Sequence, residues 1–214
     1  MLSRIGHQDL MLGQIYLCLL GRGASVRQPH SYMRKGLLMN WGTSLYGDPC
    51  RECGYDWAIS LEDALSLMAA IPARYAALLG DNDGSQRHPD LAWSAGAYVC
   101  HVTDNLRIWA ERLAGCALGG HRHVPGYDEN LLARARAYER VPIAGALWSL
   151  RHAVDNWTEA VDLALRGRIV LIHAERGAQT ALDVVRNNTH DAYHHEWDIH
   201  RSVADRDCGE DRLC

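Results

Sequence analysis

Apolar residues recur at helical spacing along most of the chain after residue 60. The segment LEDALSLMAAIPARYAALLG, which follows Ser60, places apolar side chains three or four residues apart. This is the pattern of a helix with one buried face. Ser60 and Asp63 have the spacing of a capping box, and Gly80 suits the end of the helix. The pattern therefore predicts a helix between Ser60 and Gly80.

The same period predicts four further helices. They are expected at about residues 89–117, 128–140, 142–167 and 179–203. The intervening segment RIVLIHA reads as a short strand or an extended connector, and without a partner strand it forms no sheet of consequence. Four long helices and one short one bury their apolar stripes most readily as a four-helix bundle. We therefore expect an all-α fold.

The ends of the chain lack this periodicity. Residues 1–47 carry scattered Gly, Arg and Pro, and we expect them to form a poorly structured extension. The bundle then covers residues 48–206, and residues 207–214 form a tail. The extension is not expected to carry the function.

Charge and cysteine content exclude several classes of protein. The formal net charge is −4 and no basic patch is visible, which argues against nucleic acid as a partner. The long apolar run at residues 10–20 is too short to span a membrane. Seven scattered cysteines, an odd number, are typical of a reducing cytosol. We therefore expect a cytoplasmic protein without a membrane anchor.

The stretch NNTHDAYHHEWDIHR, residues 187–201, is unusually rich in metal ligands. It holds two pairs four residues apart, Asp191 with His195 and His190 with His194, and such pairs share a helix face. His195 falls on the apolar stripe of the last helix with Asp191 at its edge, whereas His190 and His194 point about 100° to the side. Asp191 and His195 are therefore the preferred ligands, and His190 and His194 are the runner-up pair.

A third ligand is expected from the second long helix. Catalytic zinc sites usually have three protein ligands and an open fourth position. In helical bundles these ligands project inward from facing helices. His101 can complete the set with Asp191 and His195. Asp104 and Asp198 are candidates to accept a hydrogen bond from the second ring nitrogen of each histidine.

Two segments resemble motifs of the DinB-like superfamily. They are AWSAGAYVCHVTDNL, residues 92–106, and HDAYHHEWDI, residues 190–199. The resemblance covers roughly residues 55–203 and implies a DinB-like bundle in which His101, Asp191 and His195 hold a divalent metal, zinc or nickel. The chain departs from the family at Asp191, where His is usual, or Glu in the mycothiol-dependent maleylpyruvate isomerase branch. His190 or a water could take that place.

The resemblance also implies an activity. The chain is similar to the mycothiol-dependent maleylpyruvate isomerase branch of this superfamily. That similarity implies a transferase or isomerase that acts on a small electrophile with the help of a low-molecular-weight thiol, such as mycothiol or bacillithiol. The expected partners are then that thiol and electrophile, and a homodimer is compatible with this interpretation. A hydrolase would use the same three ligands with water. A non-catalytic, stress-associated metal-binding module is the main rival.

A second candidate site is the CxxC of DPCRECGYDW, formed by Cys50 and Cys53. It resembles half of a zinc knuckle, but no second CxxC follows, and Cys208 and Cys214 lie in the expected tail. Three interpretations stay open: a turn with two free thiols, a metal knuckle completed by other residues, and a redox pair. The knuckle raises a further functional alternative, a small regulator that binds zinc through its CxxC.

Overall fold

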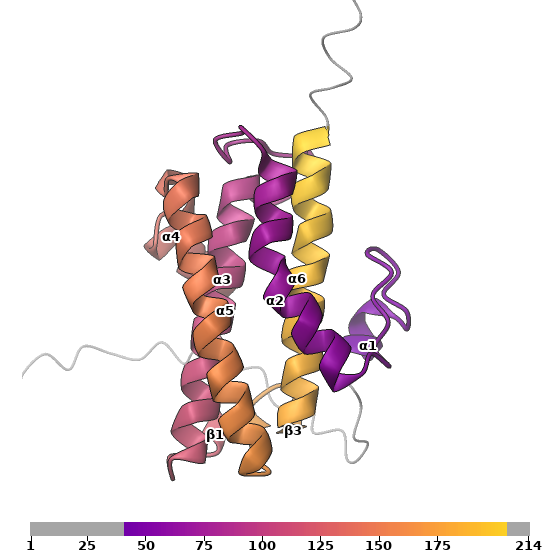
Figure 1. Cartoon of the computed structure of the whole chain (residues 1–214), viewed down its shortest axis with the longest axis vertical. Coiled ribbons are helices and arrows are strands. Elements are labelled where there is room, and N and C mark those ends of the chain that lie inside the picture. Colours follow the sequence, from indigo (N-terminus) through magenta and orange to yellow (C-terminus); the bar gives the residue numbers. More distant parts are fainter. Residues whose placement is uncertain (1–40, 205–214) are drawn as a thin grey trace, which may run out of the picture. The chain divides into compact units, whose positions relative to one another are not determined.

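The computed structural model describes residues 41–204. These residues form six α-helices, one 3₁₀ helix and a three-stranded sheet (Figure 1). In chain order the elements are α1 (Trp41–Tyr46), α2 (Leu61–Leu79), α3 (Ala95–Ala117), β1 (His123–Val124), α4 (Glu129–Ala135), η1 (Tyr138–Arg140), α5 (Ile143–Arg166), β2 (Val170–His173), β3 (Gly177–Thr180) and α6 (Ala181–Ala204).

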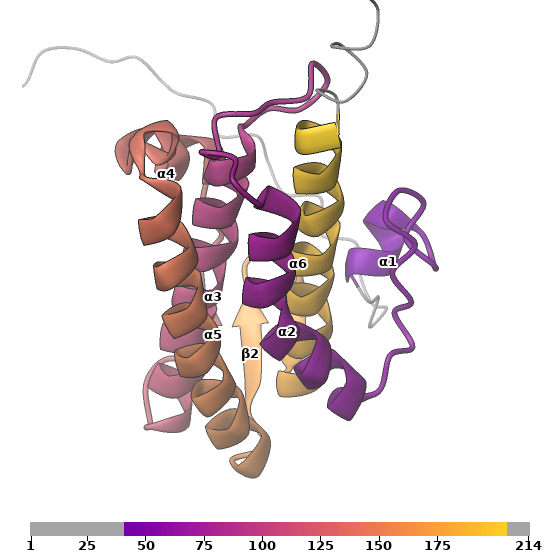
Figure 2. The same cartoon turned by 45° about the horizontal axis from the view of Figure 1, so that its top comes forward.

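The four long helices α2, α3, α5 and α6 pack against one another as a bundle. Helix α3 contacts both α5 and α6, and α2 lies along α6 (Figures 1 and 2). Large apolar side chains from all four helices fill the space between them; Met68, Trp109, Trp157 and Ile199 are fully buried. This burial is the main stabilising contribution to the fold. The predicted four-helix bundle is confirmed.

Capping residues decide where two of these helices begin. Ser60 accepts a hydrogen bond from the Asp63 amide and donates one to its carboxylate, as the capping box predicted. Helix α3 starts at Ala95, later than the start predicted near Pro89. Ser94 caps it by accepting from the Ala97 amide, and carbonyls of the preceding loop, residues 84–86, accept from the first two helical amides.

The short helix predicted over residues 128–140 is in fact two separate elements. Helix α4 ends at Ala135, and Ala137 adopts a left-handed conformation with φ of 51°. The 3₁₀ turn η1 then buries Tyr138, whose hydroxyl donates to Asp104 on α3. The interruption thus coincides with a tertiary contact that the local periodicity does not contain.

The RIVLIHA segment forms a strand that pairs with two other strands, which the sequence analysis did not predict. Strand β2 pairs in parallel with β1 and antiparallel with β3. Each strand is at most four residues long, and the sheet lies near the end of α5 and the start of α6 (Figure 2). It brings the loop around residue 125 and the β2–β3 turn next to α3. The sheet thus closes one end of the bundle.

The segment before α2 lies against the face of α6 that points away from α5 (Figure 1). Residues 41–47 were predicted to belong to the poorly structured extension, yet they contain α1. Together with Tyr55, Trp57 and Cys50 this segment builds a small second apolar cluster, in which Tyr193 of α6 takes part. The rest of the expected extension, and the tail with Cys208 and Cys214, lie outside the described residues. No described helix has the length and apolar character needed to cross a membrane.

Candidate metal centre

The three residues predicted as metal ligands come together between α3 and α6. His101 Nε2 lies 3.7 Å from Asp191 Oδ1, and His195 Nε2 lies 3.7 Å from the same oxygen. One ligand atom from each residue falls within 4.8 Å of the other two. Asp191 and His195 converge because they are four residues apart on α6, and His101 faces them from α3. This arrangement agrees with the prediction from the sequence that Asp191 and His195 share one face of the last helix and meet His101.

These separations fit a divalent ion better than direct contact between the side chains. A distance of 3.7 Å is too long for a hydrogen bond. Two nitrogen or oxygen ligands on one tetrahedral zinc are about 3.4 Å apart, given metal–ligand bonds of about 2.1 Å. A contraction of a few tenths of an ångström would bring the Asp191 oxygen to that spacing from each histidine nitrogen. Two imidazoles and one carboxylate are also a common ligand set for catalytic zinc.

Two neighbouring residues hold the ligands in orientation. Asp198 Oδ2 lies 2.9 Å from His195 Nδ1, which places the ring proton there and leaves Nε2 free to ligate. Asn105 Nδ2 donates to Asp191 Oδ2 at 2.7 Å, and Tyr127 donates in turn to Asn105. Sequence reasoning named Asp198 but missed Asn105. The sequence signal that could have identified Asn105 is its position four residues after His101, on the same face of α3.

Charge interactions outweigh burial at both α6 ligands. Burial raises the pKa of Asp191, but His101, His195 and the hydrogen bond from Asn105 bring it well below its usual range. Burial lowers the pKa of His195, but the hydrogen bond to Asp198 and the charge of Asp191 raise it above the ordinary value. The Asp191 carboxylate is thus ionised and can bind a cation, whereas a metal ion must compete with a proton for His195.

Asp104 does not take the role that the sequence analysis expected for it. Its carboxylate accepts from Tyr138 at 2.7 Å and lies 3.0 Å from Arg136 Nε and 3.6 Å from Arg107 Nη1. These partners tie η1 and the end of α4 to α3. His101 instead packs beneath the Trp93 ring, with ring centroids 5.0 Å apart. The carboxylate of Asp104 is thus engaged by Tyr138 and two arginines rather than by His101.

The three ligands open onto a pocket of about 470 Å³. Its wall also includes Arg112, Arg176 and His173 from the end of the molecule where the small sheet lies. Burial lowers the pKa of both guanidinium groups, although each keeps an ordinary arginine's charge at neutral pH. Arg112 Nη1 is buried and has no hydrogen-bond partner within residues 41–204. A pocket of this size with convergent cationic groups suits a small organic anion.

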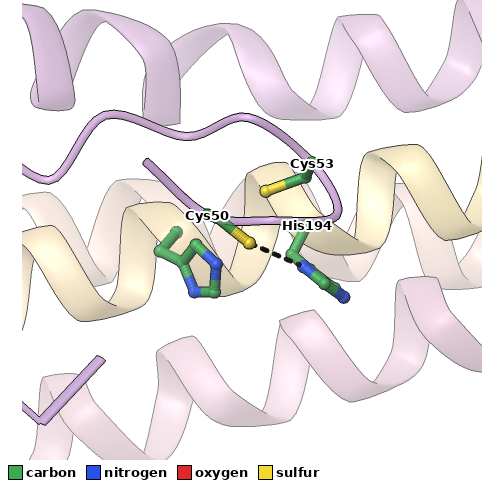
Figure 3. A group of neighbouring side chains, drawn as sticks. Cys50, Cys53 and His194 are labelled. Atoms are coloured by element: carbon green, nitrogen blue, oxygen red, sulfur yellow. Dashed lines mark hydrogen bonds between the residues drawn. The ribbon is translucent and has the colours of Figure 1, made fainter. Parts of the chain in front are cut away.

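His190 and His194, the runner-up ligands, face a different group of residues. They lie on the neighbouring face of α6, toward the CxxC loop, where Cys50 Sγ is 3.8 Å from His194 Nδ1 (Figure 3). One ligand atom from each of Cys50, Cys53, His190 and His194 falls within 4.8 Å of the others. Asp191, and not His190, is therefore grouped with His101 and His195. Sequence reasoning had not joined the CxxC to these histidines.

Comparison with known proteins supports the fold alone. No protein-family model matches the chain, and no curated protein sequence matches it either. Among solved structures it is similar to YfiT from Bacillus subtilis, a probable metal-dependent hydrolase with an unusual four-helix bundle topology. The TM-score is 0.58 at 18% sequence identity, covering 71% of this chain and 91% of that chain. This similarity supports the four-helix bundle fold.

Proposed function

We propose that this protein is a metal-dependent enzyme in which His101, Asp191 and His195 bind one divalent ion, with zinc the expected metal. The observation that carries the proposal is the position of the three ligands at the edge of a pocket of about 470 Å³. Asp191 keeps 28% of its side chain exposed, so the ligands do not enclose the ion completely. A structural ion would be closed in by four protein ligands, whereas a catalytic ion keeps a position open.

The chemistry follows from that open position. A bound divalent ion lowers the pKa of a coordinated water or thiol and so supplies a nucleophile at neutral pH. Residues around the ligands orient them, bind the substrate and exclude water. Asn105 and Asp198 keep the ligands in place, Arg112 and Arg176 bind an anionic group of the substrate, and Trp93 and Tyr98 exclude water from one side of the pocket.

Two nucleophiles lead to two candidate activities. Hydrolysis is supported by the similarity to YfiT, a probable metal-dependent hydrolase. Transfer or isomerisation with a low-molecular-weight thiol is supported by the DinB-like motifs and by the pocket, which is far larger than one water requires. Its arginines can bind a carboxylate of the thiol, where the thiol carries one as bacillithiol does, or a carboxylate of the electrophile. We favour a small anionic substrate in either case.

The metal site is tested with two single substitutions. His101→Ala and His195→Ala should each abolish turnover and weaken metal binding at this site, while the bundle stays folded by circular dichroism. His123→Ala, at an exposed histidine of β1, is the matched control and should leave both unchanged. The measurement is metal content after dialysis against a weak chelator. Full occupancy of this site in both variants would refute the ligand set.

The nucleophile is tested by following its consumption. Metal-loaded protein is incubated with esters or amides of small carboxylic acids, and separately with an electrophilic chloroarene together with mycothiol, bacillithiol or glutathione. Acid release without thiol identifies a hydrolase, whereas thiol loss matched by chloride release identifies a transferase. Because an isomerase regenerates its thiol, thiol-dependent isomerisation of an unsaturated dicarboxylic acid is assayed in parallel. Absence of all three activities at full metal occupancy would favour the non-catalytic metal-binding module.

A further inference from the structure

We propose that Cys50, Cys53, His190 and His194 form a second metal site, a closed tetrahedral zinc site that fastens the segment before α2 to α6. This inference goes beyond the proposed enzymatic function and does not depend on it. The site would be structural, because its four protein ligands leave no position for a substrate.

The ligand spacing and geometry match those of a Cys₂His₂ site. The cysteines have the C-x₂-C spacing and the histidines the H-x₃-H spacing typical of structural zinc. The Cys50 Sγ to His194 Nδ1 distance of 3.8 Å compares with about 3.6 Å for a sulfur and a nitrogen on the same tetrahedral zinc. In Figure 3 both cysteines lie on the loop that passes over α6, beside His194.

His190 has a ring nitrogen that the protein leaves unsatisfied. Only 4% of the residue is exposed, and its buried Nε2 has no hydrogen-bond partner among the described residues. Aromatic rings surround it: the ring centroids of Trp57, Tyr46 and Tyr55 lie 4.4, 4.7 and 5.3 Å from that of His190. Burying a polar nitrogen without a partner is costly, typically about 1–3 kcal/mol. A bound ion removes that cost.

His194 is oriented as metal-bound histidines usually are. Its Nε2 lies 3.2 Å from Oε2 of Glu52, which stands between the two cysteines in the sequence, while its Nδ1 faces Cys50. A carboxylate on one ring nitrogen fixes the proton there and makes the other nitrogen the ligand. The CxxC loop thus supplies two sulfur atoms and also the carboxylate that orients a histidine.

The backbone of the CxxC loop is arranged to hold both sulfur atoms on one side. The Gly54 amide donates to the Cys50 carbonyl, and the Cys50 amide donates to the Tyr55 carbonyl, each at 2.9 Å. Gly54 has φ of 74°, a conformation that favours glycine. This tight turn explains why glycine directly follows the second cysteine. It also keeps the loop closed over α6.

The two proposed sites can coexist on one helix. The ligand pairs of α6 are offset by one residue, so His190 and His194 face the loop while Asp191 and His195 face α3. The rings of His194 and His195 are 5.7 Å apart, and Asp198 lies between them, 2.9 Å from His195 Nδ1 and 4.0 Å from His194 Nε2. Two thiolates neutralise a divalent ion, so the second site adds no net positive charge beside the first.

The site gives a reason for the position of α1 and its loop. The apolar cluster that this segment forms with α6 has only three buried members, Cys50, Tyr55 and Trp57. Such a small cluster holds a segment weakly, and small units often depend on a metal. Tyr46, which also lines the pocket of the first site, belongs to the same segment. Zinc bound here would therefore also complete the wall of the pocket.

Metal stoichiometry of the full chain tests the proposal. Wild-type protein should bind two zinc ions, and both the double variant Cys50→Ser/Cys53→Ser and the single variant His101→Ala should bind one. Cys116→Ser is the matched control, a buried thiol outside both groups, and should bind two. With cobalt in place of zinc, the thiolate-to-cobalt charge-transfer absorption should persist in His101→Ala and disappear in the double variant.

A measurement on wild-type protein covers the case in which the double variant fails to fold. Cys50 and Cys53 should resist alkylation in zinc-loaded protein and become reactive after chelation, as peptide mass spectrometry would show. Equal alkylation with and without zinc overturns the proposal, and so does a disulfide between the two residues or a missing cobalt charge-transfer band. If His101→Ala keeps its full metal content while the cysteine variant loses one ion, the proposed function fails and this second site stands.

Discussion

At the scale of single residues, adjacent side chains of helix α6 contact different parts of the molecule. Asp191 accepts from Asn105 on α3, while His190, one position earlier, contacts the rings of Tyr46 and Trp57. Consecutive helical residues point about 100° apart, so one short segment can face two surroundings. The density of histidine in residues 187–201 thus has two separate causes.

Asp198 should control metal affinity at the first site without touching the metal. Asp198→Asn keeps the size of the side chain but removes the charge that polarises His195. We expect metal affinity at the His101 site to fall about 10–100-fold. Competition with a chromophoric chelator measures it, and Asp155→Asn, at an exposed aspartate of α5, is the control. An unchanged dissociation constant would show that Asp198 does not orient the ligand.

His173 should make the protein sensitive to acid. Burial lowers the pKa of His173 to about 4, and the Glu175 and Arg176 amides donate to its Nδ1. In the unfolded chain its pKa is about 6.5. Between these values the unfolded state binds more protons, so the free energy of unfolding decreases as the pH falls from about 6.5 to 4.

Substitution of His173 tests this dependence. His173→Asn keeps an acceptor for the two amides but does not titrate, so its unfolding free energy should decrease less than that of the wild type over the same pH range. His173→Phe also does not titrate but loses the acceptor, and it should be less stable at every pH. Urea unfolding of chelated protein at several pH values provides the data. Parallel curves for wild type and His173→Asn would contradict the assignment.

At the scale of elements, close backbone contact determines the start of α3. The Gly96 amide donates to the Gly84 carbonyl at 2.8 Å, and a Cβ atom on Gly96 would lie 3.1 Å from that carbonyl oxygen. A side chain at residue 96 would therefore require the loop before α3 to shift by a few tenths of an ångström. This packing, which the local sequence does not contain, overrides the helix start predicted near Pro89.

Two glycines of α3 should respond in opposite directions to substitution. Gly96→Val should reduce the free energy of unfolding by about 1–3 kcal/mol, because the backbone has no room for the side chain. Gly115→Ala, where nothing lies within 4 Å of the new Cβ atom, should raise it by about 0.5–1 kcal/mol through helix propensity. Denaturant unfolding of both variants measures the two changes. Equal effects at both positions would argue against the tight crossing.

At the scale of the whole molecule, the two metal sites should link stability to free zinc. A ligand that binds only the folded state raises the free energy of unfolding by about 1.4 kcal/mol for each tenfold increase in its concentration, per bound ion. Above saturation the wild type should gain about 2.7 kcal/mol per tenfold increase. His101→Ala and Cys50→Ser/Cys53→Ser should each gain about half of that. Unfolding at buffered zinc concentrations measures the slopes, and equal slopes in all three proteins would exclude two independent sites.

Much of the bundle can be read from the sequence because helical periodicity is a local property. The apolar spacing placed α2, α5 and α6 within a few residues of their observed ends. The grouping of Asp191 with His195 followed from their spacing on one helix, and His101 followed from its position on the second long helix. In each of these cases, a short segment contains the necessary information.

Only the tertiary structure decided which distant segments meet. Cys50 and His194 are 144 residues apart, and no local pattern links a CxxC to a pair of histidines on the last helix. Three further features were equally hidden: the strand at residues 123–124, the role of Asn105 and the pairing of Asp104 with Tyr138. Side-chain direction on a helix can be predicted from spacing, but the neighbour that it meets depends on how the elements pack.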